Sequence, residues 1–168
     1  MSDFIRKRLE ASNEGKFEFH TNEIASEFVG KNKSAQSVKT LSGKEYFADL
    51  FVICTGVQPN IEIAKDAGIE IGSTGAIKVN KLMQTSVENI FACGDCAEKR
   101  HIINGKNVWI PLGSTANKEG RCAAMNAAGI YCEFEGVLGS AVSRCLNTTM
   151  SMTGFTEKKA IKFGYTPV

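Results

Sequence analysis

The sequence lacks the features that mark membrane, secreted and nucleic-acid-binding proteins. Its net charge is only +2 and it has no dense stripe of Lys and Arg, so the charge pattern does not indicate a nucleic-acid partner. The longest purely apolar run near the centre, Leu50–Cys54, is far too short to span a bilayer. The polar opening Met1-Ser2-Asp3 is unlike a signal peptide. We therefore expect a cytoplasmic protein with no membrane and no nucleic-acid partner.

Histidine and tryptophan are also scarce. His20 and His101 are expected to be surface or hairpin residues rather than catalytic bases, and the single tryptophan, Trp109, is expected to pack in a hairpin arm. We predict no catalytic residue and no metal site. The six cysteines, in a chain without a secretion signal, are expected to be free thiols. Lys99-Arg100 is expected to be a solvated pair in a loop.

What the chain does contain is the composition of a globular protein, 43% hydrophobic and 23% charged over 168 residues. This length is enough for one sizeable domain or two small ones. Residues 3–12 predict a short amphipathic helix. Further along the chain, segment 49–54 has a continuous apolar run that is typical of a strand buried on both faces. Between them, strand character predicts an antiparallel meander over 16–20, 37–41 and 44–47.

The second half of the chain predicts short helices and hairpins. A helix is expected to begin at Asn60, as its N-cap, and to stop at Gly68. Asn104-Gly105 is a strong signal for a tight hairpin. The other expected elements are a hairpin over 69–79, a strand over 90–93 and a helix over 114–128 that stops at Gly129.

Residues 91–96, Phe-Ala-Cys-Gly-Asp-Cys, allow two incompatible interpretations. Cys93 and Cys96 have the C-x-x-C spacing of a redox dithiol or of half a zinc site. Alternatively, a strand stops at Gly94, and Asp95 projects from its end as a ligand acceptor, at the sheet edge where α/β folds bind ligands. The second interpretation is favoured, because redox dithiols normally lie at a helix start. The zinc hypothesis lacks a second C-x-x-C or H-x-x-H pair.

A second feature of the same kind follows Asp95. The helix expected from Gly113-Ser114 offers unpaired backbone N–H groups and a positive dipole end, which suit an electron-rich carbonyl or a developing anion on a planar ring. An ionised Asp95 can accept two hydroxyl hydrogen bonds from a polyol chain, each worth roughly 1.5–3 kcal/mol. The sequence permits both features at one site.

Several segments resemble the pyridine nucleotide–disulfide oxidoreductases, and they follow one another along the chain in the order of that family. Residues 85–98 (TSVENIFACGDCAE) look like the family's second flavin-binding motif, 46–60 (YFADLFVICTGVQPN) like the return from the NAD(P)H domain to the FAD domain, and 110–121 (IPLGSTANKEGR) like the helix start that borders the flavin ring. Residues 134–140 and 153–157 are similar to the opening of the interface domain. The most similar branch comprises the NADH oxidases, NADH peroxidases and coenzyme A-disulfide reductases.

The resemblance implies an α/β fold: part of the three-layer, FAD/NAD(P)-binding architecture with two dinucleotide-binding domains, plus the start of an α+β interface domain. It assigns residues 1–57 to the C-terminal part of the NAD(P)H-binding domain, 58–133 to the second segment of the FAD-binding domain, and 134–168 to the start of the interface (dimerisation) domain. The implied cofactors are FAD and NAD(P)H. Hydride would pass from nicotinamide to flavin and on to a small-molecule acceptor, which would be a disulfide, a peroxide or oxygen.

The family's cofactor contacts can be carried over to matching positions. Asp95 would bind the ribityl chain of FAD, and Gly94 would leave room for the cofactor to approach. The residues implied to lie beside the flavin ring are Pro111, Leu112 and Gly113. Those implied to approach the nicotinamide end of NAD(P)H are Thr55 and Gly56.

The sequence also departs from the family pattern. The two G-x-G-x-x-G motifs of the family do not occur in these residues, and its redox-active cysteine precedes the matching segments. We therefore expect a C-terminal-half piece of a longer oxidoreductase that does not turn over NAD(P)H by itself. The alternative is a non-catalytic folded module that acts only in assembly or cofactor binding. A homodimer, or self-association through truncated edges, is expected.

Overall fold

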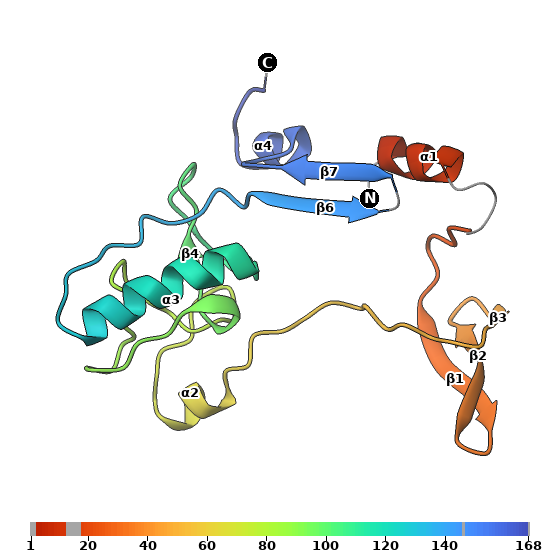
Figure 1. Ribbon diagram of the computed structural model, residues 1–168, viewed down its shortest axis with the longest axis horizontal. Coiled ribbons are helices and arrows are strands. Elements are labelled where there is room, and N and C mark those ends of the chain that lie inside the picture. Colours follow the sequence, from red (N-terminus) through yellow and green to blue (C-terminus); the bar gives the residue numbers. More distant parts are fainter. Residues whose placement is uncertain (1–2, 13–17, 146, 168) are drawn as a thin grey trace. The chain divides into compact units, whose positions relative to one another are not determined.

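The structure, a computed structural model, describes residues 3–12, 18–145 and 147–167 (Figure 1). These residues form two compact units. The first contains the described residues as far as Val57 together with Asn147 and Thr148. The second contains Gln58–Cys145 and the described residues from Thr149 onward.

The first unit holds helix α1 (Asp3–Ser12) and an antiparallel sheet of β1 (Ala25–Lys31), β2 (Ser34–Thr40) and β3 (Glu45–Phe47), in the order β1-β2-β3. Asn32 and Lys33 join β1 to β2 with φ of 52° and 63°, as a type I′ hairpin turn requires. The helix predicted over 3–12 and the strands predicted near 37–41 and 44–47 are confirmed. Strand β1 was not predicted, because register shifts at Ala25/Glu27 and Val29/Gly30 interrupt the alternation of its side chains between the two faces of the sheet.

The strand predicted over residues 49–54 is wrong, because this segment has no regular secondary structure. Leu50 and Val52 are each 78% exposed, and Ile53 is 66% exposed. A strand that is apolar on both faces needs paired neighbours and covering helices, and no strand of the described residues pairs with this one. Of the strand predicted over 16–20, residues 16 and 17 lie outside the described residues, and 18–20 have no regular structure.

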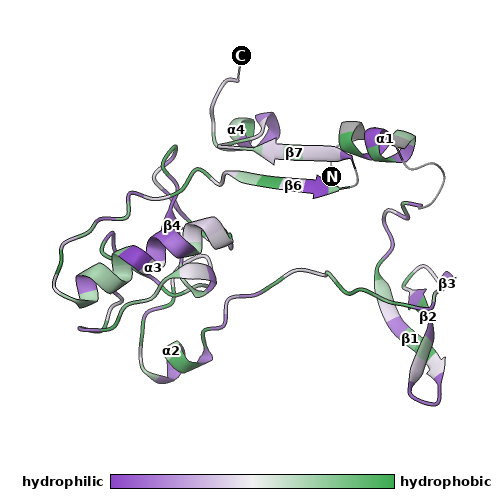
Figure 2. Cartoon of the chain, in the orientation of Figure 1, coloured by the Kyte–Doolittle hydropathy of each residue, from purple (hydrophilic) through white to green (hydrophobic). Residues whose placement is uncertain are grey.

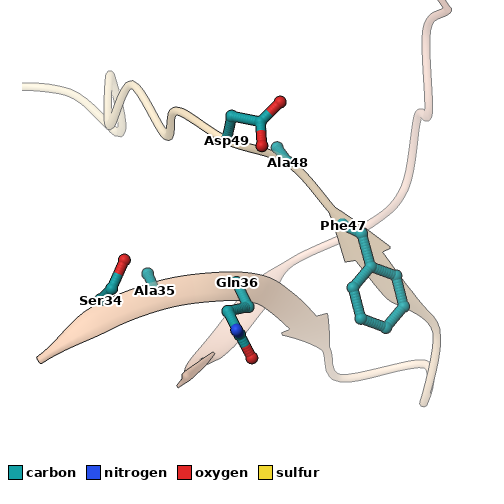
Figure 3. A pocket seen from close by; sticks show the side chains of 6 residues that line it. All are labelled: Ser34, Ala35, Gln36, Phe47, Ala48 and Asp49. Atoms are coloured by element: carbon teal, nitrogen blue, oxygen red, sulfur yellow. The ribbon is translucent and has the colours of Figure 1, made fainter. Parts of the chain in front are cut away.

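An open hollow lies where the chain leaves β3 and separates from β2 (Figure 3). The last link between the two segments is the N–H of Ala48, which donates to the carbonyl of Gln36 at 3.2 Å. Figure 3 shows the Asp49 carboxylate and the Gln36 amide directed to opposite sides. The lining side chains therefore do not converge on a common point, and we assign no chemistry to this hollow.

The rest of the chain consists of short elements and one longer helix. They are α2 (Glu62–Asp66), the 3-10 helix η1 (Gly94–Cys96), the paired strands β4 (Lys99–Arg100) and β5 (Asn107–Val108), α3 (Gly113–Ala127), the paired strands β6 (Ala141–Cys145) and β7 (Thr148–Met152), and α4 (Glu157–Lys162). Figure 2 shows that α3 is near neutral at its start, hydrophilic in the middle and more hydrophobic towards its end. No helix in the described part of the chain combines the length and apolar character needed to cross a bilayer.

Most predictions for this half are confirmed, with shifted bounds. Helix α3 matches the helix predicted over 114–128, and Gly129 follows it with φ of 78°. The hairpin at Asn104-Gly105 exists, although Arg100 pairs with Asn107, so the loop is longer than a tight turn. Helix α2 is shorter than predicted, and its N-cap position is occupied by Ile61 instead of Asn60. The strand predicted over 90–93 is reduced to a single bridge between Gln84 and Phe91.

The second unit contains the core that positions the site. One buried cluster consists of Ile61, Ala64, Ile69, Ile77, Ala92 and Ala97. The other consists of Met83, Cys122 and Ala123. Ala92 belongs to the first cluster, whereas its neighbours Phe91 and Cys93 pack against the second. Residues 91–93 therefore alternate between two apolar clusters, as a strand buried on both faces does, and they lead directly into Gly94.

Candidate functional site

The turn at Gly94-Asp95 follows from the backbone conformation of Gly94. Cys93 is extended, with φ of −153° and ψ of 165°, and Gly94 then adopts φ of 78°, a left-handed conformation that favours glycine. Asp95 follows within η1 and is exposed. Its carbonyl accepts a hydrogen bond from Nε1 of Trp109 at 2.7 Å. The backbone of Asp95 is thus fixed, while its carboxylate stays available to a ligand.

Trp109 has a role here that the sequence did not reveal. It directly follows strand β5 and is half-buried, and its indole N–H holds the backbone of Asp95. A buried or half-buried indole usually finds an acceptor for this N–H, so the position of Trp109 after the β4–β5 hairpin was the available signal. The hydrogen bond joins two segments that are 14 residues apart.

The start of helix α3 lies next to this turn. A Cβ placed on Gly94 would be 3.4 Å from the Cβ of Ala116, in the first turn of α3. Leu112 is the N-cap residue, has an extended backbone and provides no side-chain cap. Within the described residues, the N–H groups of Gly113 and Ser114 have no hydrogen-bond acceptor. The first turn also carries no acidic side chain, so its positive dipole end is not neutralised locally.

Pro111, Leu112 and Gly113 therefore lie in the same unit as Gly94 and Asp95, and close to them through α3. A hollow of about 410 Å³ opens on this helix start, and it is lined by Leu112, Gly113, Ser114, Ser140, Ala141, Val142, Ser151 and Met152. Most of this lining is small or apolar. Such a surface suits a flat, largely apolar ring with a few polar edges.

A buried ion pair lies beneath the turn and the helix start. Nζ of Lys99 lies 3.0 Å from Oε1 of Glu119, and the two side chains are 1% and 0% exposed. Oε1 of Glu119 accepts no hydrogen bond, whereas Oε2 accepts one from Nζ of Lys99 at 3.3 Å. Oε2 also accepts the N–H of Gly94 at 2.6 Å. The Lys99 ammonium further donates to the carbonyls of Gly94 at 3.2 Å and Ile110 at 3.4 Å.

This pair corrects the expectation that Lys99-Arg100 is a solvated loop pair. The two residues form strand β4, and successive side chains of a strand point to opposite faces, so Lys99 is buried while Arg100 is exposed. Glu119 lies on the buried stripe of α3 together with Cys122 and Ala123, at the i, i+3, i+4 spacing of one helix face. That spacing was a signal for its burial.

The thiols of Cys93 and Cys96 show no sign of redox activation. Both are free, and Sγ of Cys96 donates to the carbonyl of Cys93 at 3.3 Å. Burial, followed by the neighbouring Cys96, raises the pKa of the Cys93 thiol above its ordinary value. A redox-active thiol needs a lowered pKa. Among the described residues, no group of three or more His, Cys, Asp or Glu side chains could hold a metal ion.

Thr55 and Gly56 lie in the first unit, at the end of the segment that has no regular structure. Both are exposed, and Gly56 has φ of 110° with open space around its Cα. A side chain at Gly56 would be strained whatever its surroundings. The predicted role of these residues at a nicotinamide ring stays a prediction.

Comparisons with known proteins agree on one family. The family model described as pyridine nucleotide-disulphide oxidoreductase matches residues 1–120. The NAD(P)H sulfur oxidoreductase (CoA-dependent) of Pyrococcus furiosus is 52% identical over 123 residues, which are 73% of this chain and 28% of that protein. The NAD(P)H coenzyme A polysulfide/persulfide reductase of Pyrococcus horikoshii is 46% identical over 156 residues, 90% of this chain and 35% of that protein. The chain thus spans about a third of these relatives' length.

A solved structure gives the same assignment. The FAD-dependent pyridine nucleotide-disulphide oxidoreductase from Desulfovibrio vulgaris superposes with a TM-score of 0.87 and 35% identity, covering 98% of this chain and 40% of that one. The predicted α/β fold, a part of the FAD/NAD(P)-binding architecture, is thereby confirmed. FAD and NAD(P)H are also confirmed as the cofactors of the family. Since the family model covers more than two thirds of its residues and the relatives include both sulfur reductases and an NADH oxidase, the chain belongs to the pyridine nucleotide-disulphide oxidoreductases.

Proposed function

We propose that the chain is part of an FAD-dependent NAD(P)H oxidoreductase, and that Gly94-Asp95 and residues 111–113 contact FAD. One observation carries this proposal: the Gly94-Asp95 turn lies against the first turn of α3 within one compact unit. An exposed carboxylate and unpaired helix N–H groups are thereby held near each other. These are complementary to the polyol and the carbonyl-bearing ring of a flavin nucleotide.

The residues present fit FAD in their chemistry. The Asp95 carboxylate can accept hydrogen bonds from ribityl hydroxyls, and charge-assisted bonds of this kind are stronger than neutral ones. Gly94 is buried, and the absence of a side chain there lets the turn pack closely on Ala116 of α3. When bound, FAD supplies the ability to take up hydride from NAD(P)H and to pass reducing equivalents onward. The N–H groups of Gly113 and Ser114 are placed to stabilise negative charge at this helix start, in the manner of an oxyanion hole.

For the pyridine nucleotide, we propose that Thr55 and Gly56 lie at the nicotinamide end. The positive φ of Gly56 and the open space around it support this role, because a missing side chain lets a flat ring stack on the backbone. For the acceptor, we propose a small molecule: a disulfide, a peroxide or oxygen. The names of the two Pyrococcus relatives favour a sulfur compound linked to coenzyme A.

We further propose the domain assignment 1–57, 58–133 and 134–168, a cytoplasmic location, and a homodimer or self-association through exposed edges. The boundary between compact units after Val57 supports the first division. Exposed apolar side chains support association, and they include Phe47 at 77%, Leu50 at 78% and Val142 at 73%. A sedimentation profile that stays monomeric over a wide concentration range would count against association.

The chain alone is proposed to be inactive in turnover, since its residues contain no G-x-G-x-x-G motif for either pyrophosphate. Sustained NADH consumption by the pure chain would contradict this. Association of these residues with FAD is tested separately, by titrating the chain with FAD and following flavin fluorescence.

In that titration we expect saturable binding that Asp95→Ala weakens roughly 10- to 100-fold, the loss of one charge-assisted hydrogen bond. The matched control is Asp66→Ala, which removes an exposed aspartate at the end of α2. Equal affinity of the Asp95→Ala and Asp66→Ala variants would contradict the assigned site.

A further inference from the structure

We infer that Lys99 and Glu119 are positioning residues for the FAD site. Their buried ion pair holds the Gly94-Asp95 turn and the start of α3 in one fixed arrangement. This inference rests on the proposed function, because it names the side chains that set the geometry of the proposed FAD contacts. Neither residue is exposed, so neither is offered as a cofactor contact.

The first step of the argument is that Gly94 is held from both sides. Its N–H donates to Oε2 of Glu119 at 2.6 Å, and its carbonyl accepts from Nζ of Lys99 at 3.2 Å. Glycine has the widest choice of backbone conformations of all residues, so an unrestrained Gly94 could turn Asp95 in many directions. Two charge-assisted hydrogen bonds on adjacent peptide groups remove that freedom. The direction of the Asp95 side chain therefore depends on the ion pair.

The second step is that the same ammonium reaches the helix start. Nζ of Lys99 lies 3.4 Å from the carbonyl of Ile110, the residue before Pro111. Glu119 is itself part of α3. Lys99 thus connects the carbonyl of the turn, the carbonyl that precedes the helix, and the helix. These are the segments to which the proposed function assigns the FAD contacts.

The third step concerns why charges are present at all. Burying an ion pair costs more desolvation than an apolar pair, and well-packed apolar residues of similar volume often give equal or greater stability. Apolar residues here would leave the N–H of Gly94 and the carbonyl of Ile110 without these partners. The pair therefore supplies directional bonds that an apolar core cannot supply.

The test compares Lys99→Met, Glu119→Gln and the double variant, in which both charges are absent, with the unaltered chain. The matched control is Lys78→Met, which breaks an exposed ion pair with Glu70 (2.7 Å, side chains 49% and 53% exposed). Two readouts are needed. One is the chemical shift and hydrogen-exchange rate of the Gly94 amide, measured by NMR without FAD. The other is the dissociation constant for FAD.

We expect the Gly94 amide to exchange at least about 10-fold faster in Lys99→Met and Glu119→Gln, and its resonance to move upfield, because its charged acceptor is lost or displaced. We expect the dissociation constant for FAD to rise roughly 10- to 100-fold. The double variant should regain the thermal midpoint of the unaltered chain, but it should not regain its affinity for FAD. Lys78→Met should change neither readout.

The outcomes separate this inference from the proposed function. An unchanged Gly94 amide in both single variants overturns the inference, whatever FAD does. A lowered thermal midpoint with unchanged FAD affinity also overturns it, because the pair would then be merely structural. Failure of the unaltered chain to bind FAD contradicts FAD binding by these residues alone, while the amide readout still decides whether the ion pair sets the conformation of Gly94. If Lys99→Met does not fold, the isosteric Glu119→Gln variant supplies both readouts.

Discussion

Residues 49–54 and 90–93 are both short apolar runs, yet the structure treats them in opposite ways. Val52 and Leu50 are each 78% exposed, whereas Ala92 is only 9% exposed and belongs to a buried cluster. Residues 90–93 are hydrogen-bonded to a neighbouring segment, since the N–H of Ala92 donates to the carbonyl of Met83 at 3.0 Å and the carbonyl of Ile90 accepts from Thr85 at 2.9 Å, whereas no described strand pairs with residues 49–54. Phe91 and Cys93 pack against a second cluster that includes α3 residues.

The comparison shows that an apolar run becomes a core element only when other elements cover its two faces. Residues 90–93 have apolar clusters on both sides within their own unit. In residues 49–54 only Phe51 has a described ring contact, edge-on against Phe28 of β1 at 5.3 Å between ring centroids, and Leu50 and Val52 stay exposed. The functional consequence follows the same division. The packed residues 90–93 fix the position of the Gly94-Asp95 turn that follows them. The exposed run 49–54 leads to Thr55-Gly56, which are exposed as well.

The largest expected effect comes from breaking the buried run. Phe91→Ala removes a ring that packs against Met83, Cys122 and Ala123, and we expect a loss of about 2–4 kcal/mol in the unfolding free energy of the second unit. Urea denaturation followed by fluorescence of Trp109, the only tryptophan, measures it. A loss below about 0.5 kcal/mol, the range of surface substitutions, would contradict the assigned packing.

A smaller effect is expected at the turn that the buried run delivers. Gly94→Ala places a Cβ on a residue with φ of 78°, and a left-handed conformation costs non-glycine residues about 1–2 kcal/mol. The same denaturation experiment applies. The matched control is Gly113→Ala, at a position in α3 without positive φ and with open space around it, where no loss is expected. Equal effects at both positions would show that the left-handed turn is not the cause.

A pH dependence should sharpen the comparison further. Burial, followed by the charge of Lys159, lowers the pKa of His101 from its ordinary 6.5. Its ring stacks on Phe155 at 4.4 Å, and its Nδ1 accepts the N–H of Ile103. Because the folded state favours neutral imidazole, this stabilisation is present above pH 6.5 and is lost as pH falls from there through the folded-state pKa.

We therefore expect the second unit to lose stability as the pH falls below 6.5, the ordinary pKa of histidine. Thermal midpoints across this range measure the slope. His101→Gln keeps a hydrogen-bond acceptor for Ile103 but cannot titrate, so it should flatten the profile. A slope that survives in this variant would assign the pH dependence to another group.

The smallest effect is expected in the exposed run. Val52→Ala should change the stability of the first unit by no more than about 0.5 kcal/mol, because a side chain that is 78% exposed loses little contact on truncation. Far-UV circular dichroism on heating follows this unit through its sheet. A loss of 1 kcal/mol or more, the scale of a buried methyl group, would mean that Val52 is covered in solution.

The site was only partly predictable from the sequence. Gly94, Asp95 and the helix start at Gly113 were found, because a glycine after an apolar run and a helix boundary are local signals. The burial of Lys99 and the hydrogen bond of Trp109 were not predicted, since both depend on partners 20 and 14 residues away along the chain. A lysine has the same local signature on a surface loop and in a buried ion pair.

By itself, the sequence determined the local elements: the helix over 3–12, the extent of α3, the turn around Asn104-Gly105 and the Gly-Asp motif. Its motifs also determined the family. Only the tertiary structure decided which apolar run is buried and which is exposed, and that Lys99 and Glu119 meet beneath Gly94. Helix periodicity and turn conformation depend on residues a few positions apart, so they can be recognised locally. Burial and charge pairing depend on which distant segments come together, and the fold alone sets that.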